Sequence, residues 1–287
     1  MITHVNNNLR FNTCPLCNSL EIAKINNFSY TKPTYFSSNE IVLSKQPELW
    51  KCSYCESSFV QNIIPEEMSK SLYCQGYSDQ RWKSEPFSHS KSIHLTNTLQ
   101  SFFQKDLKIL DIGCNTGELL DFAKLQGCET FGIEYSESSH KALKQKGHII
   151  FSDIDNTNER FNIITAFDLI EHIYNVPDFL NTCFKQLLPS GYLILFTGNI
   201  MCLTAKLLKG KWWYIGWPEH IVFPSIKYFE IQNNFKVIQV IKTYHSNYFK
   251  PNLNLFFKTF LKKGYKNYNG VPAMQADHIM IILKKEN

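Results

Sequence analysis

The chain has 287 residues, of which 44% are hydrophobic and 19% are charged, and its formal net charge is +5 at pH 7. This length and apolar content suit one α/β domain with a small appendage. Because no apolar run is long enough to cross a bilayer and the first residues lack a signal-peptide segment, we expect a cytoplasmic protein.

The positive charge is concentrated late in the chain. Residues 231–276 hold seven lysines and no acidic residue, which exceeds the whole surplus of +5. The rest of the chain is slightly acidic, so a basic surface of the kind that binds nucleic acid is not evident. We therefore do not expect a nucleic-acid partner.

Residues 1–75 contain two Cys-x-x-Cys pairs separated by 34 residues: Cys14, Cys17, Cys52 and Cys55. Each pair can offer two thiolates from one tight turn, and two pairs complete a tetrahedral shell with no position for water. This predicts structural zinc in a zinc-ribbon-like module too small to fold on its own core. Asn18 and Glu56 stand where such turns often place Gly, and Asn suits that position better. Four unrelated buried thiols, or a redox pair, are the alternatives; neither pair opens a helix after a strand, as a redox motif would.

Residues 76–106 are expected to form a helical connector, with a helix over 92–103, before an α/β domain over 107–287. We expect strands at 107–112, 129–134, 148–152, 161–167, 190–196, 235–243 and 277–284, the last one antiparallel. We expect helices at 117–126, 136–146, 176–188, 198–208 and 224–233. An insertion over 244–276 interrupts this domain.

The first strand ends in a Gly-containing turn, Gly113-Cys-Asn-Thr-Gly117, and an acid, Glu134, ends the next strand. Glycines let the backbone approach a nucleoside cofactor, and a carboxylate at a strand end can bond its ribose hydroxyls. The dinucleotide pattern requires Gly where Asn115 stands, and Asp111 precedes the turn, so nicotinamide cofactors are disfavoured. Asn115 remains compatible with a tight turn because Asn tolerates positive φ.

Residues 107–134 resemble motifs I and II of the class I S-adenosylmethionine-dependent methyltransferases. Ser152–Ile154, Phe167–His172 and Leu187–Phe196 agree with later motifs of that family, and the resemblance covers roughly residues 95–245. It implies a Rossmann-like seven-stranded sheet and S-adenosylmethionine as cofactor. The implied cofactor-binding residues are Asp111, Gly113, Asn115, Gly117, Glu134, Tyr135, Asp153, Ile154 and Asp168. In this family the acid at Asp153 meets the adenine amino group, with Tyr135 and Ile154 flanking the ring; turn and capping duty is the alternative for Asp111 and Asp153.

Three residues are candidates for acceptor chemistry: Glu171, His172 and His220. Methyl transfer to oxygen, nitrogen or carbon often requires removal of a proton from the acceptor. Related methyltransferases use the Glu-His pair region for acceptor contact, and some bind a divalent metal there. A polar helix start (Glu171 and His172) and a packed histidine (His220) are the alternatives. The loop around His220 carries Trp212, Trp213, Tyr214 and Trp217, which could form an apolar wall for a sugar ring or another flat acceptor.

The cysteine pairs, the core and the Trp-rich loop together resemble methyltransferases of bacterial surface-polysaccharide and deoxysugar pathways. Deoxysugar C-methyltransferases carry a further C-terminal domain that is not seen here, so we expect O-methylation, or N-methylation, of a sugar or nucleotide sugar. An RNA methyltransferase is the enzymatic alternative, although no basic and aromatic nucleic-acid motif is recognisable. A non-catalytic, cofactor-binding scaffold subunit is the second alternative. The presence of Asp111, Glu134 and Asp153 argues against a loss of activity.

The insertion has helical periodicity, with Leu253, Phe256, Phe257, Phe260 and Leu261 on one face. Packing on the core or on a second subunit of an oligomer is one interpretation. The other is a lid or a peripheral membrane element near a lipid-linked or anionic substrate.

Overall fold

The structure is a computed structural model that describes residues 2–30, 34–75, 87, 93–243 and 276–286. The helix expected in the insertion and most of the expected connector lie outside these residues.

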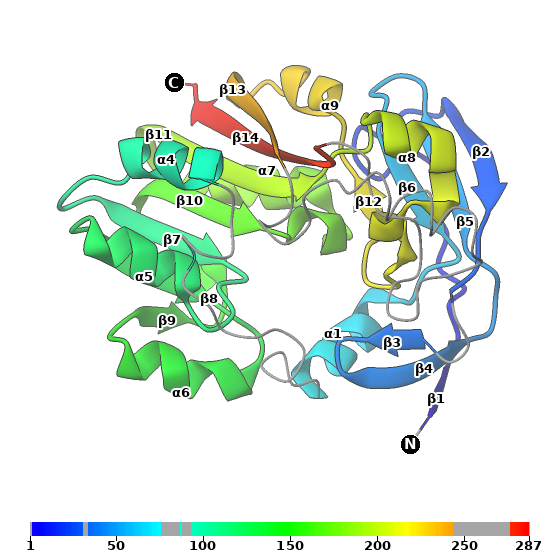
Figure 1. The fold of residues 1–287 in the computed structure, drawn as a ribbon, viewed down its shortest axis with the longest axis horizontal. Helices are drawn as coiled ribbons and strands as arrows, with labels where there is room; N and C mark the ends of the chain where they lie inside the picture. Colours follow the sequence, from blue (N-terminus) through cyan, green and yellow to red (C-terminus); the bar gives the residue numbers. More distant parts are fainter. Residues whose placement is uncertain (1, 31–33, 76–86, 88–92, 244–275, 287) are drawn as a thin grey trace.

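A seven-stranded sheet forms the centre of the larger part of the chain, described over residues 93–243 and 276–286 (Figure 1). Its strands, in chain order, are β7 (Lys108–Ile112), β8 (Glu129–Ile133), β9 (Ile149–Phe151), β10 (Phe161–Phe167), β11 (Leu187–Gly198), β13 (Phe235–Thr243) and β14 (His278–Lys285). Their spatial order is β13-β14-β11-β10-β7-β8-β9, and β14 runs antiparallel to both of its neighbours. The predicted sheet with an antiparallel last strand is therefore confirmed.

Both faces of this sheet are buried, which is why its central strands are continuous apolar runs. Successive residues alternate between the faces: Ile109 packs in one core cluster and Leu110 in the other. On the first face the packing partners come from α4 (Ile93–Phe102) and α5 (Glu118–Leu125). On the second they come from α7 (Val176–Gln186), α9 (Ile226–Glu230) and the N-terminal residues.

One helix begins later than expected. The expected helix over 198–208 is α8 (Leu203–Leu208), because β11 extends to Gly198 through pairing with β14. The Cys202 sulfur then accepts a hydrogen bond from the Ala205 amide at 3.3 Å and caps the helix. The remaining predicted helix, 136–146, is observed as α6 (Glu137–Gln145).

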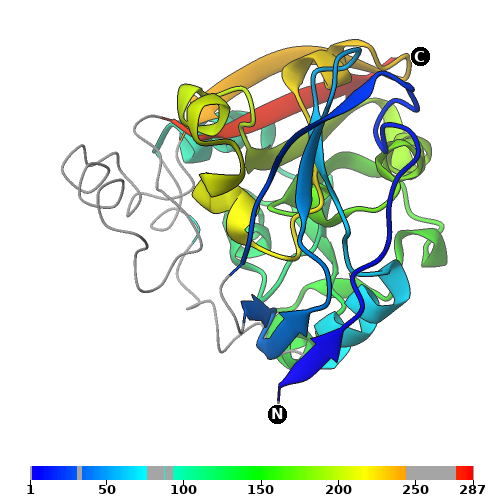
Figure 2. The same cartoon turned by 90° about the vertical axis from the view of Figure 1, so that its right-hand side faces the viewer.

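The N-terminal residues form two small sheets and one helix, α1 (Glu66–Gln75). The three-stranded sheet contains β1 (Thr3–Val5), β4 (Asn39–Leu43) and β3 (Thr34–Phe36). The four-stranded sheet contains β2 (Ile22–Asn27), β5 (Glu48–Cys52), β6 (Ser58–Gln61) and β12 (Val222–Phe223). Because β12 comes from the larger part of the chain, the N-terminal strands and the yellow segment that contains β12 lie side by side in both views (Figures 1 and 2). One hydrophobic core cluster also spans the two parts, with Phe59 and Leu195 among its members.

Candidate functional site

The predicted cofactor residues lie near the carboxyl ends of parallel strands. The turn after β7 has positive φ at Gly113 (77°), Asn115 (46°) and Gly117 (86°), so Asn115 takes the left-handed conformation expected of it. A Cβ at Gly117 would lie 2.8 Å from the Leu143 side chain, which only a glycine avoids. The turn therefore packs closely against α6, which contains Leu143. Its backbone amides lie at the edge of the sheet where ligands bind in open α/β folds.

Glu134 fixes this turn from the end of β8. Its two carboxylate oxygens accept hydrogen bonds from the backbone amides of Asn115 and Ser136, each at 2.8 Å. A carboxylate has about four lone-pair sites, so these two bonds leave capacity for ribose hydroxyls. The position beside the turn fits the role implied by the resemblance, and contact with the ribose stays a prediction.

Glu134→Ala is expected to weaken S-adenosylmethionine binding by about 1–3 kcal/mol, because a charge-assisted contact and the support of the turn are lost together. Titration calorimetry with S-adenosylmethionine measures this directly. Glu137→Ala, at an exposed acid three residues on, is the matched control. Equal affinities of the Glu134 variant and the unmodified chain would rule out the role.

Asp111 lies inside the sheet rather than at the turn. Its side chain is 5% exposed and accepts a hydrogen bond from the Thr165 hydroxyl at 2.6 Å. Burial raises the pKa of this carboxyl to about 7. Neither turn nor capping duty describes this position, and its part in holding the cofactor stays a prediction.

The other predicted cofactor residues follow β8, β9 and β10. Asp153 caps the short 3-10 turn Ile154–Asn156, accepting from the Asp155 amide at 3.4 Å, which is the capping duty left open by the sequence. Ile154 packs on the core and Tyr135 is 52% exposed. Asp168 follows β10 with φ of 51°, its amide bonded to the Phe196 carbonyl at 2.8 Å. Contact of these residues with the adenine ring stays a prediction.

The three candidates for acceptor chemistry come together. One ligand-type atom from each of Glu171, His172 and His220 lies within 4.8 Å of the others, although His220 is 48 residues further along the chain. Glu171 is fully buried; it accepts hydrogen bonds from the Thr197 hydroxyl at 2.9 Å and from the Tyr214 hydroxyl. Burial, followed by the negative charge of Asp168, raises the pKa of Glu171 to about 8.

Both histidines have a backbone carbonyl near Nδ1, and in His220 this contact fixes the tautomer. His220 Nδ1 lies 2.6 Å from the Tyr214 carbonyl oxygen, and His172 Nδ1 lies 3.0 Å from the Glu219 carbonyl oxygen. A carbonyl oxygen can only accept, so we assign the proton of the His220 ring to Nδ1, and its Nε2 carries the basic lone pair. His172 Nδ1 also lies 2.9 Å from the Tyr73 hydroxyl, which can donate as well as accept. Burial lowers the pKa of His220 well below its usual value, which keeps that imidazole neutral. The two rings meet edge to face, with centroids 4.8 Å apart.

Glu171→Gln is expected to flatten the pH dependence of stability. The pKa of Glu171 is raised from 4.5 to about 8, so the folded chain binds more protons than the unfolded chain in this range and its stability falls as pH rises through it. The melting temperature of the unmodified chain should therefore decline more between these pH values than that of the variant. If the melting temperatures of the two proteins change with pH in parallel, the pKa of Glu171 is not raised by burial. Glu137→Gln, at an exposed acid, is the control.

Several residues of this cluster could not be singled out from the sequence. The Tyr73 hydroxyl, on α1, lies 2.9 Å from His172 Nδ1. On β14, His278 Nδ1 lies 2.9 Å from the carboxylate of Asp277, and that carboxylate also accepts from Trp213 Nε1 at 2.6 Å. Tyr73 was visible only as an aromatic residue in a polar stretch. The Asp-His dipeptide at the start of the last strand was the one available signal for the other pair.

The expected aromatic wall is wrong for most of its members. Trp212 and Tyr214 are at most 2% exposed and Trp213 is 8% exposed, so these rings are core. They pack against one another and against Phe223 and His278. These core contacts are enough to explain why so many aromatic residues occur in this loop. Trp217 is the member that keeps partial exposure.

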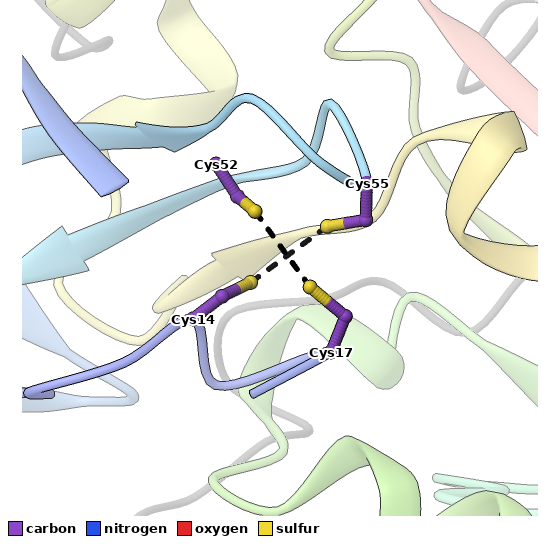
Figure 3. A group of neighbouring side chains, drawn as sticks. All are labelled: Cys14, Cys17, Cys52 and Cys55. Atoms are coloured by element: carbon purple, nitrogen blue, oxygen red, sulfur yellow. Dashed lines mark hydrogen bonds between the residues drawn. The ribbon is translucent and has the colours of Figure 1, made fainter. Parts of the chain in front are cut away.

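The four cysteines form a compact group around one point (Figure 3). The Cys14 and Cys55 sulfurs are 3.7 Å apart, those of Cys17 and Cys52 are 3.6 Å apart, and all four lie within 4.8 Å of one another. A tetrahedral zinc–thiolate shell with bonds of about 2.3 Å places its sulfurs about 3.8 Å apart, so this donor set fits zinc. The residues after the pairs, Asn18 and Glu56, have φ of 59° and 61°, the left-handed conformation expected at both. Glu56 therefore adopts it despite being the less suited residue type.

The chain was compared with known protein families. A family model described as a methyltransferase domain matches residues 88–240, more than half of the 287 residues. The chain belongs to this methyltransferase family. It carries a class I S-adenosylmethionine-dependent methyltransferase domain, as its sheet and Gly-containing turn indicate.

Curated relatives of this methyltransferase include two ubiquinone biosynthesis O-methyltransferases. That of Bradyrhizobium sp. (strain ORS 278) is 33% identical over 159 residues, covering 48% of this chain and 63% of the relative. That of Bradyrhizobium diazoefficiens is 33% identical over 103 residues, covering 32% of this chain and 40% of the relative. This chain therefore matches less than two thirds of either relative's length. Neither name refers to polysaccharides.

Among solved structures, the methyltransferase resembles the N-methyltransferase NodS from Bradyrhizobium japonicum WM9, solved with S-adenosyl-L-homocysteine. The TM-score is 0.48 and the identity 13%, covering 77% of this chain and 98% of NodS. Within the described residues, no helix combines the length and apolar character needed to cross a bilayer.

Proposed function

We propose that this methyltransferase transfers a methyl group to a hydroxyl oxygen of a small molecule, with His220 as the base. The observation that carries the proposal is the His220 tautomer: its Nδ1 is held by the Tyr214 carbonyl, and this is the ring's one hydrogen bond among the described residues. Its Nε2 is thereby directed to accept a proton from an acceptor hydroxyl. When bound, S-adenosylmethionine supplies the electrophilic methyl group.

The need for a base favours oxygen over nitrogen as the methylated atom. A neutral amine already offers its lone pair, whereas a hydroxyl becomes a strong nucleophile only as its proton leaves. Burial and the neighbouring His172 lower the pKa of His220; against them, the negative charge of Asp168 favours the protonated form. This stabilises the imidazolium that forms during transfer. His172, held by Tyr73 and Glu219, then has the role of orienting the acceptor.

Two acceptor classes are favoured by different observations. A sugar or nucleotide sugar of surface polysaccharide biosynthesis is our first candidate, from the resemblance of the cysteine pairs, the core and the aromatic loop to that group. A phenolic ring is the second, because the named relatives are ubiquinone biosynthesis O-methyltransferases. A partial membrane association would accompany either a lipid-linked sugar or a prenylated phenol.

Transfer of labelled methyl from S-adenosylmethionine into a bacterial extract tests the proposal. The extract is fractionated into nucleotide sugars, lipid-linked glycans, phenolic lipids, RNA and protein, and His220→Asn is assayed in parallel as the variant expected to lose transfer. Label in a sugar or phenolic fraction supports the proposal and chooses between the classes. Label in RNA would establish the RNA methyltransferase instead. Cofactor binding without label in any fraction would favour a scaffold subunit.

We also propose that Cys14, Cys17, Cys52 and Cys55 hold one structural zinc ion. The sulfur spacing and the two left-handed residues after the pairs support it. Purified protein is expected to contain about one equivalent of zinc, measured by plasma mass spectrometry, and to lose it when Cys52 is replaced by Ser. Because binding energy contributes to folding, chelation should also lower the melting temperature. Metal-free protein with an unchanged melting temperature would remove this proposal.

A further inference from the structure

We infer that the four-cysteine centre positions the active site as well as stabilising the N-terminal residues. The second cysteine pair is hydrogen-bonded into the segment 219–225, which carries His220. The centre thereby sets the place of the His220 imidazole, which makes its cysteines and Ser225 positioning residues. This inference rests on the proposed role of His220 and on the proposed zinc ion.

Ser225 makes the first link. Its hydroxyl donates to the Cys55 carbonyl oxygen at 2.5 Å and accepts from the Tyr228 amide at 3.0 Å, where it caps α9. Its own amide donates to the Ser57 hydroxyl at 3.0 Å. Ser225 is 1% exposed, so no solvent competes for these bonds. The cysteine turn and the start of α9 are therefore one hydrogen-bonded unit.

The pairing of β6 with β12 makes the second link. Phe59 faces Val222 and Ser58 faces Phe223, so β6 continues from the cysteine turn directly into this pairing. The Val60 amide then donates to the Ile221 carbonyl oxygen at 2.8 Å. These bonds hold the two residues that follow His220.

Ile221 makes the last link, to the acidic member of the site. Its amide donates to the Glu171 carbonyl oxygen at 2.8 Å. The same residue thus bonds β6 through its carbonyl and the catalytic Glu-His pair through its amide. From Cys55 to His220 the path contains only short, buried backbone and hydroxyl bonds.

The dependence on the metal follows from the size of β12. A two-residue strand has no stability of its own and takes its position from the strand it pairs with. β6 begins three residues after Cys55, so a zinc ion held by the Cys52 and Cys55 thiolates would fix the turn at its start. Without the metal, β12 would lose the strand that fixes its position, and His220 would shift with it. A displacement of about 1 Å at a reacting group can lower a rate about 10²-fold. The cofactor turn, on β7 and β8, is not on this path.

Amide exchange measured by mass spectrometry, with and without zinc removal by a chelator, tests the inference. We expect exchange over residues 219–225 to rise at least about tenfold, with exchange over 108–117 and S-adenosylmethionine affinity unchanged. Methyl incorporation into the extract should fall at least about tenfold at saturating cofactor. Unchanged exchange over 219–225 would overturn the inference. So would an equal rise over the whole catalytic sheet, since the metal would then only maintain the fold.

Ser225→Ala provides a second test that leaves all four cysteines in place. We expect normal zinc content, faster exchange over 219–225 and a several-fold loss of methyl incorporation. Lys227→Met is the matched control: Lys227 contacts the same cysteine turn, at Glu56, through an ion pair that is partly exposed. Zinc-replete Ser225→Ala with unchanged exchange and transfer would count against the path. If His220→Asn remains fully active, the proposed function fails, while the exchange data still decide the structural link.

Discussion

His220→Asn is expected to lower kcat for methyl transfer by about 10²–10⁴-fold while leaving S-adenosylmethionine affinity unchanged. Asparagine can place its amide N–H where His220 Nδ1 donates to the Tyr214 carbonyl, so the loop keeps its hydrogen bond. What it cannot supply is a basic nitrogen at the position of Nε2. The expected loss is therefore in the chemical step and not in folding or cofactor binding.

The measurement is the rate of labelled methyl incorporation over a range of pH, with calorimetry for the cofactor. His4→Asn, at an exposed histidine in β1, is the control for effects of a histidine-to-asparagine substitution outside the site. If His172→Asn abolishes transfer and His220→Asn does not, the base is His172 and the assignment made here is wrong. If both variants keep full activity, no histidine of this site removes the proton.

Gly198→Ala is expected to disturb folding and catalysis together. A Cβ at Gly198 would lie 2.3 Å from two atoms of the Tyr214 ring, so that ring must move. Tyr214 donates its hydroxyl to Glu171 and offers its carbonyl to His220, so one displaced ring disturbs both groups. We expect a loss of about 1–3 kcal/mol of stability, typical of overpacking, and at least a tenfold loss of transfer.

Urea unfolding measures the first effect and methyl incorporation at a temperature where the variant is folded measures the second. Gly127→Ala is the matched control, because Gly127 has φ of 86° and lies at the end of α5, away from the histidines. It should lower stability without lowering transfer in the folded protein. Full activity of Gly198→Ala would show that Tyr214 does not position the site.

The sequence was sufficient for the parts of the fold that local pattern determines. The strands around Ile109 and Ile194 are continuous apolar runs because both faces of the sheet are buried, and their order follows from the family resemblance. The conformation of Asn115 could be predicted because Asn is one of the few residues that adopts positive φ readily. The start of α8 was predicted too early because pairing of β11 with β14 overrides local helix propensity as far as Gly198.

The parts that escaped prediction depend on contacts between distant segments. Nothing in the two residues Val222 and Phe223 indicates that they pair with β6, 163 residues earlier for Val222 and Phe59. Tyr73 lies 99 residues before His172, and no local pattern connects them. The aromatic density near Trp212 was interpreted as a ligand wall because sequence cannot distinguish a buried ring from one that faces an open site.

The sheet formed by β2, β5, β6 and β12 bears on how such a chain can be inherited. A zinc module with a closed sheet could be gained, lost or exchanged by recombination at its boundary without harm to its host. Here one edge of the sheet is supplied by Val222 and Phe223, so removal of the N-terminal residues would leave an apolar backbone edge unpaired beside His220. A replacement module would have to match that edge residue by residue. We therefore expect the N-terminal residues and the methyltransferase domain to be inherited together.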